Sequence, residues 1–165
     1  MRSKHGQLKR CGLLATLTLT SALLGATTAT RAAEHPNFTG NWQADPKTSD
    51  FGPMGAPDKA VMNVTHKEPE VTIHSEMVMG GTPRTWEATC KTDGKECKST
   101  NGEVTLSVQW QGDTLILNRA LSFNGMAVKV KETWSLSTDG KTLTSARALS
   151  ADQGTMDQKI VFTKP

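Results

Sequence analysis

The sequence of 165 residues contains no tyrosine, and aromatic residues make up only 5% of it. No stretch repeats apolar residues with the helical period of about 3.6 over several turns, which excludes a helical bundle. A Gly-rich phosphate loop and a strand-turn-helix nucleophile elbow are also absent from the sequence. We therefore expect a protein that is not an enzyme and that has no catalytic residue and no cofactor.

Cysteine is scarce, with three in the chain, and only Cys90 and Cys97 lie in its main body. No histidine or further cysteine stands at ligand spacing from them, so we expect no metal site. A hairpin folded at Asp93-Gly94 would place the two thiols opposite each other, and export to an oxidising compartment would favour a disulfide. Two free thiols remain the alternative, because a disulfide at a hydrogen-bonded pair of a ladder can be strained.

Residues 1–33 are typical of a secretory signal peptide. They begin with basic residues, continue with an uncharged stretch from Cys11 to Ala29, and end in small residues at Ala32 and Ala33. The uncharged stretch is rich in threonine and lacks the stop-transfer charges of an anchor, which disfavours a retained membrane helix. We expect a signal peptide over 1–33, one domain over 34–165, and a periplasmic or secreted location.

The net charge changes from positive to negative when residues 1–33 are left out of the count. The chain has 19 Lys and Arg against 16 Asp and Glu, but five of the basic residues precede residue 34, which leaves 14 against 16. A mildly acidic domain has little attraction for phosphate backbones or anionic membranes. We expect no nucleic-acid partner and no membrane association after processing.

Polar and apolar residues alternate with a period of two from residue 37 to the end, with turn residues between the runs. This pattern predicts an all-β protein: an antiparallel up-and-down meander closed into a barrel of about eight to ten strands, because closure removes the exposed edges. The long Pro- and Gly-rich segment 46–58 has the length expected of a loop over the barrel mouth. About 130 residues suffice for a single monomeric domain of this kind.

Two independent turns, at Asn124-Gly125 and Asp139-Gly140, predict the register of the later strands. The first places Leu117 opposite Glu132, and the second places Glu132 opposite Arg147. A slip of one residue at either turn would move every side chain to the other face. The shared face is apolar except for three charges: Arg119, Glu132 and Arg147.

The first strand opens with Phe38-Thr39-Gly40-Asn41-Trp42, which resembles the F-x-G-x-W opening of lipocalins, avidins and fatty-acid-binding proteins, the calycin superfamily. The resemblance implies that Gly40 and Trp42 are structural, that Trp42 plugs one end of the barrel, and that a late basic side chain, a role open to Arg147, stacks on it. The chain also resembles small exported bacterial lipocalin-like proteins of unassigned function, through Asp45-Pro46, Ser49-Asp50-Phe51-Gly52 and the run from Trp134 to Thr144. It departs from lipocalins in lacking their T-D-Y motif, and from fatty-acid-binding proteins in lacking a helical pair over 46–58.

The charged trio is the candidate ligand site, with Trp134 beside it. Two arginines face one glutamate, so the surplus charge calls for water, Gln158 or an anionic head group, and the planar guanidinium suits a carboxylate. A structural salt-bridge network without a ligand is the alternative. We expect binding of a small hydrophobic or amphiphilic anion, and the competing hypothesis is a protein-protein module such as an inhibitor of secreted hydrolases.

Overall fold

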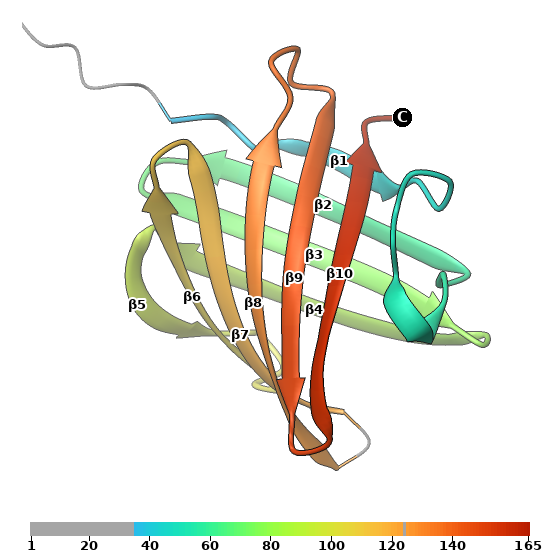
Figure 1. Cartoon of the computed structure of the whole chain (residues 1–165). Helices are drawn as coiled ribbons and strands as arrows, with labels where there is room; N and C mark the ends of the chain where they lie inside the picture. Colours follow the sequence, from blue (N-terminus) through green and yellow to red (C-terminus); the bar gives the residue numbers. More distant parts are fainter. Residues whose placement is uncertain (1–34, 124) are drawn as a thin grey trace, which may run out of the picture. The chain divides into compact units, whose positions relative to one another are not determined.

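A computed structural model of the chain describes residues 35–123 and 125–165 (Figure 1). The predicted signal peptide and Asn124 lie outside the described residues. Within them there are ten strands and one short 3-10 helix, η1 (Gly52–Met54). The strands are β1 (Gly40–Ala44), β2 (Lys59–Lys67), β3 (Glu70–Met79), β4 (Thr82–Lys91), β5 (Asp93–Lys98), β6 (Val104–Gln111), β7 (Thr114–Phe123), β8 (Met126–Leu136), β9 (Thr142–Ala151) and β10 (Gly154–Thr163).

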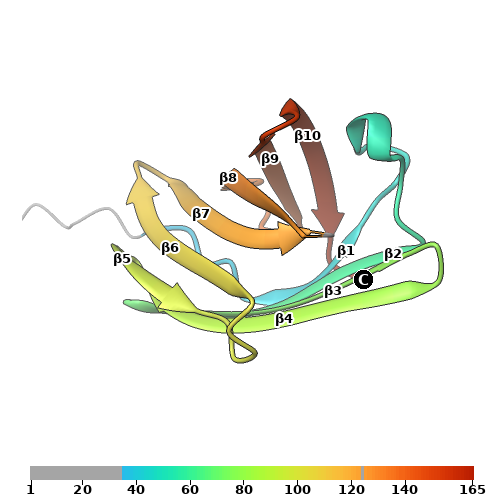
Figure 2. The same cartoon turned by 90° about the horizontal axis from the view of Figure 1, so that it is seen from below.

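All ten strands form one antiparallel sheet in the order β4-β3-β2-β1-β10-β9-β8-β7-β6-β5. The sheet curls over itself, so that β1 to β4 form one layer and β6 to β10 cross in front of it (Figures 1 and 2). The predicted all-β meander is therefore confirmed, with ten strands in a nearly closed barrel. In the parts of the chain described here, no helix is long and apolar enough to cross a bilayer.

The register predicted from the two turns is also confirmed. Leu117 pairs with Glu132 across β7 and β8, and Glu132 pairs with Arg147 across β8 and β9. Gly125 and Gly140 adopt φ angles of 80° and 67°, a left-handed conformation that costs glycine little and other residues more. Each turn thereby fixes which side chains of its strands face the interior.

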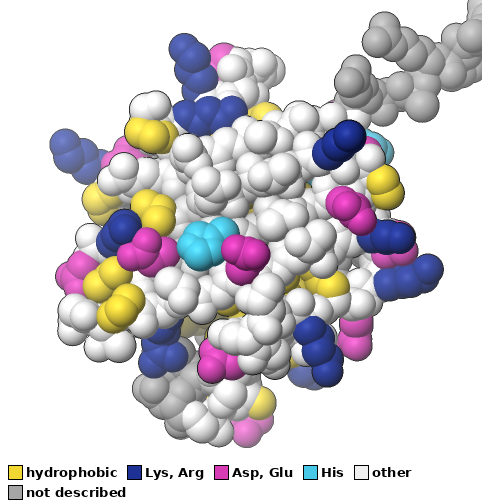
Figure 3. Space-filling view, turned by 180° about the vertical axis from the view of Figure 1, so that it is seen from behind, with side chains coloured by type: hydrophobic (Ala, Val, Ile, Leu, Met, Phe, Trp, Pro, Cys, Tyr) yellow, Lys and Arg dark blue, Asp and Glu magenta, His cyan; other side chains and the backbone are white. Residues whose placement is uncertain are grey.

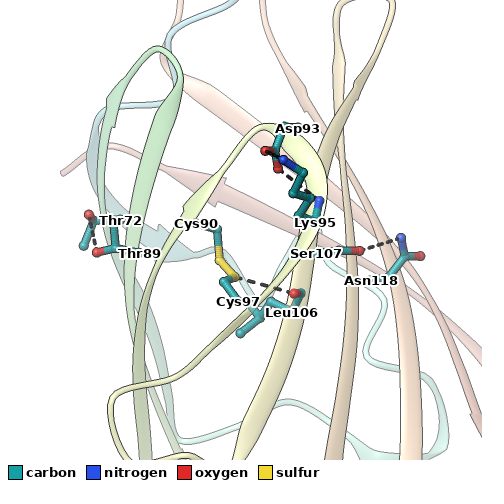
Figure 4. Close-up of a disulfide and its surroundings, with 9 residues drawn as sticks. All are labelled: Thr72, Thr89, Cys90, Asp93, Lys95, Cys97, Leu106, Ser107 and Asn118. Atoms are coloured by element: carbon teal, nitrogen blue, oxygen red, sulfur yellow. Dashed lines mark hydrogen bonds and ion pairs between the residues drawn. A yellow bond between two sulfur atoms is a disulfide. The ribbon is translucent and has the colours of Figure 1, made fainter.

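The hairpin predicted at Asp93-Gly94 is wrong, because β4 and β5 are not paired with each other. These strands share no ladder: β4 pairs with β3, β5 pairs with β6, and β4 and β5 are the two ends of the sheet. The Cys90–Cys97 disulfide is present, with the Cα atoms 5.6 Å apart, and it joins the two end strands of the sheet (Figure 4). A hydrogen bond from the Thr100 amide to the Glu87 carbonyl, at 2.8 Å, adds a second link across this gap.

Apolar side chains fill the end of the barrel at which the chain enters β1. Phe38, Trp42 and Trp134 are fully buried there, and the Trp42 indole donates a hydrogen bond of 2.9 Å to the Phe38 carbonyl. The ammonium over the Trp42 ring is that of Lys164, at 4.7 Å, whereas Arg147 lies over Phe162. The role suggested for Arg147 is thus filled by a residue just beyond the last strand, where the side chain has access to solvent.

Gly40 makes the approach of Lys164 possible. A Cβ atom at position 40 would lie 2.6 Å from Cε of Lys164 and 3.4 Å from the Trp42 ring, so any larger side chain would displace the lysine.

The outer surface of the β1–β4 layer, seen from behind, is mostly polar, with charges of both signs interspersed (Figure 3). The structure therefore has one buried face, as the alternating sequence predicts.

Replacing Trp42 should show how much the filled end contributes to stability. Trp42→Ala should lower the free energy of unfolding by about 3 to 5 kcal/mol, because a large buried side chain is lost. Trp42→Phe, which mainly leaves the Phe38 carbonyl unpaired, should cost less, about 1 to 3 kcal/mol. Urea titration followed by circular dichroism measures both, with Lys131→Met on the outer face as the control. A Trp42→Ala midpoint equal to that of wild type would contradict the structural role.

Candidate functional site

The opposite half of the barrel holds a cavity of about 590 Å³. Its walls come from the start of β2, the later part of β3, both flanks of the β7–β8 turn, and the adjoining parts of β9 and β10. The lining is largely apolar. The chain thus divides the barrel interior into a filled half and a hollow half, and the volume suits a small organic molecule.

The predicted mouth loop lines this cavity. Phe51, Pro53, Met54 and Pro57 all contribute to the wall, and Phe51 also packs against the core. Gln158 of β10 anchors the loop by donating a hydrogen bond of 2.8 Å to the Phe51 carbonyl. Figure 2 shows η1 beside β10, at the edge of the space between the two layers. The segment therefore forms part of the site and is not a mere connection.

The charged trio lies where the filled half meets the hollow half. Arg119 donates a hydrogen bond of 2.6 Å to Oε2 of Glu132, and a terminal nitrogen of Arg147 lies 3.1 Å from Oε1. The side chain of Glu132 is only 2% exposed, against 12% for Arg119 and 18% for Arg147. Arg119 and Arg147 line the cavity, whereas Glu132 is not part of its wall.

Two neutral donors complete the shell around Glu132. Its Oε1 accepts hydrogen bonds of 2.6 Å from the Trp134 indole and 2.6 Å from the Ser145 hydroxyl. Ser145 in turn accepts a bond of 3.1 Å from Nε of Arg147. The carboxylate therefore has four hydrogen-bonding or ionic partners, as a buried charge requires.

These contacts determine the charge state of Glu132. Burial by itself would raise the pKa of this carboxyl group, but the charges of Arg147 and Arg119 and the bonds from Ser145 and Trp134 outweigh burial and lower the pKa to about 2. Glu132 is thus ionised at neutral pH. Two guanidiniums and one carboxylate leave a formal surplus of one positive charge.

The environment of Arg119 is unfavourable for its charged form in two respects, burial and a neighbouring like charge. Burial lowers its pKa, the Glu132 charge raises it, and the like charge of Arg147 lowers it further. Its Nε atom is buried without a hydrogen-bond partner, and its guanidinium lies 5.5 Å from the centre of the Trp86 ring. An unpaired buried donor is unfavourable, so this arginine has unused capacity for an acceptor.

The structure separates the four predicted ligand-binding residues into two groups. Arg119 and Arg147 lie on the cavity wall, whereas Glu132 and Trp134 lie behind it in the packed interior. Trp134 therefore supports the charged trio from the filled side. Sequence reasoning overlooked Ser145, although its place opposite Trp134 and two residues before Arg147 marked it as an inward polar residue.

A second polar cluster lies at the filled end, outside the cavity. The carboxylate of Glu68 accepts hydrogen bonds from the Trp110 indole at 2.6 Å and from Thr92 at 2.8 Å, and it lies 3.0 Å from Nε2 of His66. His35 stacks on the Trp110 ring with their centres 4.1 Å apart. Within the described residues there is no group of three or more His, Cys, Asp or Glu side chains that could hold a metal ion.

No protein-family model matches the chain, and no curated protein matches it in sequence. Solved structures do match. Zebrafish ileal bile acid-binding protein complexed with cholic acid aligns with a TM-score of 0.50 and 21% identity over 78% of this chain and 98% of its own. Secretory abundant heat soluble protein 4 from Ramazzottius varieornatus aligns with a TM-score of 0.53 and 16% identity over 81% of this chain and 99% of its own. The chain has a calycin fold.

A point mutant of the fluorescent protein UnaG gives a similar result, with a TM-score of 0.52 and 16% identity over 78% of this chain and 96% of its own. The expected calycin resemblance is thus confirmed at the level of fold. This calycin barrel has only η1 between β1 and β2, in agreement with the absence of a helical pair noted in the sequence. The loop that carries Phe51 lines the cavity instead.

The low pKa of Glu132 predicts how stability depends on pH. Because the folded-state pKa lies below the ordinary value of 4.5, ionised Glu132 stabilises the fold fully above about pH 4.5, and this contribution is lost as the pH falls toward 2. Glu132→Gln should be less stable at neutral pH and should lose less stability, by a few kcal/mol, over that acid range. Urea titrations across the range measure this, with exposed Glu70→Gln as the control. Parallel pH profiles for wild type and Glu132→Gln would contradict the assignment.

Proposed function

We propose that this protein binds a small hydrophobic or amphiphilic anion, with the acidic group against Arg119 and Arg147 and the apolar part in the cavity. The observation that carries the proposal is a pair of arginines, with one unneutralised positive charge, on the wall of a largely apolar cavity. A buried surplus charge is unfavourable unless a counter-charge or water compensates it. A carboxylate or sulfonate that enters the cavity supplies that counter-charge.

The position of Glu132 supports this proposal over a purely structural network. The carboxylate is engaged from behind by Trp134 and Ser145, so it does not occupy the face that the arginines turn to the cavity. Arg119 also has a buried Nε donor without a partner. The surplus positive charge of the two arginines is therefore suited to a planar anion in the cavity.

The alternative, an inhibitor of secreted hydrolases, would fit a filled interior with an exposed apolar loop. The hollow interior with arginines on its wall favours the small-molecule binder. A catalytic role has less support, because the buried cluster contains a single carboxylate, and its pKa of about 2 keeps it ionised and unable to act as a proton donor at neutral pH. We therefore infer a non-enzymatic binding protein.

Export and a monomeric state belong to the same proposal. The disulfide between β4 and β5 supports folding in an oxidising compartment. In a host that secretes the full chain, N-terminal sequencing should show that residues up to Ala32 or Ala33 have been removed, and size-exclusion chromatography should give the mass of a single processed chain. Recovery of the intact N-terminus from the exported fraction would contradict processing, and a dimeric mass would contradict the monomer.

Arginine substitutions test the binding proposal directly. Anilinonaphthalene sulfonate, an anionic aromatic probe that brightens in apolar surroundings, should bind wild type saturably. Arg119→Met and Arg147→Met should each weaken binding about tenfold or more, since a hydrogen bond to a charged group contributes about 1.5 to 3 kcal/mol. Neutral phenylnaphthylamine should retain most of its affinity in both variants.

Lys131→Met is the matched control, because Lys131 is adjacent to Glu132 on the same strand but is exposed on the outer face. Both arginine variants leave the trio neutral, so their urea midpoints should fall less than that of Glu132→Leu, which leaves two buried like charges facing each other. Absence of a saturable signal with the probe and with a panel of fatty and aromatic acids would refute binding. Unchanged affinity in both arginine variants would refute the role of the arginines.

A further inference from the structure

Methionine is distributed unevenly in this molecule. The six methionines of the described residues, Met54, Met62, Met77, Met79, Met126 and Met156, all line the cavity. They come from the loop and from β2, β3, β8 and β10, which are far apart in the sequence. The common feature is therefore the cavity and not a single strand or turn.

Thioethers give this wall a reactivity that leucine or isoleucine would not. Methionine is flexible and polarisable, and its sulfur is converted by mild oxidants to a sulfoxide, which is polar and chiral. Cys90 and Cys97 are joined in a disulfide, so neither is a free thiol that an oxidant would attack before the methionines. The cavity thus contains the domain's readily oxidised sulfur, next to the surface that contacts an apolar ligand.

Accessibility differs among the six side chains. Met54 and Met126 are exposed, at 40% and 38%, and stand at the rim, whereas Met62 is only 4% exposed. Met77, Met79 and Met156 are intermediate. An oxidant that enters from solvent therefore meets the rim methionines first and Met62 last.

Met156 links the wall to the mouth loop. A Cβ atom on Gly52 would lie 3.4 Å from Sδ of Met156, so the thioether packs directly under the start of η1. The same part of the loop is held by the Gln158 bond to the Phe51 carbonyl and by a strand-like bridge between Asp50 and Lys159. An oxygen atom added to this sulfur would need space between β10 and the loop.

We propose that the methionine-lined wall is an oxidation site that switches off ligand binding, an inference that rests on the binding function proposed above. With hydrogen peroxide as oxidant, the thioether sulfur attacks one peroxide oxygen, the S–O bond forms and the O–O bond breaks. The departing hydroxide takes up the remaining proton and leaves as water. Sulfur is oxidised by two electrons and the peroxide is reduced. The product places sulfoxide dipoles on the apolar wall and pushes the loop away from β10.

The test uses the processed protein, hydrogen peroxide and anilinonaphthalene sulfonate. Peptide mass spectrometry should show oxidation of Met54 and Met126 first, of Met77, Met79 and Met156 next, and of Met62 last. When the second group is oxidised, affinity should fall about tenfold or more, and methionine sulfoxide reductases should restore it.

Matched variants separate wall chemistry from general damage. The triple variant Met77→Leu, Met79→Leu and Met156→Leu conserves side-chain volume closely. Its affinity for the probe before treatment is its own reference, and peroxide should lower that affinity much less than it lowers the affinity of wild type. Met54→Leu with Met126→Leu should remain sensitive. Because oxidation of several residues can unfold a protein, Met156→Gln serves as a folded mimic of the sulfoxide, and it should bind more weakly than Met156→Leu.

The outcomes distinguish this inference from the proposed function. If untreated wild type fails to bind the probe, the binding function itself is refuted, together with the switch. If wild type binds but oxidation of Met77, Met79 and Met156 leaves affinity unchanged, only the switch is refuted. Equal peroxide sensitivity of wild type and the triple leucine variant would also refute it.

Discussion

The buried carboxylate of Glu132 is the interaction on which the interior of this barrel depends. A charge so deeply placed is stable only when ionic and hydrogen-bonding partners compensate its lost hydration. Here the partners come from both sides: two guanidiniums from the cavity and two neutral donors, on Trp134 and Ser145, from the packed half. One side chain therefore orients both arginines and joins the structural half of the protein to its hollow half.

The two halves follow from where the bulky residues stand along the strands. Large rings, including Trp42 and Phe38, fill the end where β1 begins, and flexible methionines with smaller aliphatic residues line the other. Neighbouring strands keep one register across the sheet, so the inner face continues from strand to strand. What changes along the barrel axis is side-chain volume and stiffness, and this difference produces a cavity in a sheet of otherwise uniform pattern.

Closure of the barrel is achieved by two different means. The β1–β10 pairing closes one side with backbone hydrogen bonds, whereas the β4–β5 gap is joined by the disulfide and by the hydrogen bond that the Thr100 amide donates to the Glu87 carbonyl. The covalent link lies close to the filled end, because Cys90 belongs to the buried core there. The hollow half keeps a mouth loop that rests on β10 through Gln158 and Met156, which connects loop position to the chemistry of the cavity wall.

The sequence by itself determined the all-β meander, the register set by two of its turns, and the meeting of Arg119, Glu132 and Arg147 on one face. Those features depend on local chemistry: period-two alternation selects strands, and the Gly125 and Gly140 turns fix the register between neighbours. Tertiary structure alone decided that Trp134 lies behind the cavity wall, that Lys164 and not Arg147 covers Trp42, and that Cys90 and Cys97 bridge a gap and not a hairpin. Each of these features depends either on the position of a side chain along the barrel axis or on contacts between strands that are not paired. Strand alternation specifies which face a side chain lies on, but not its position along the barrel axis.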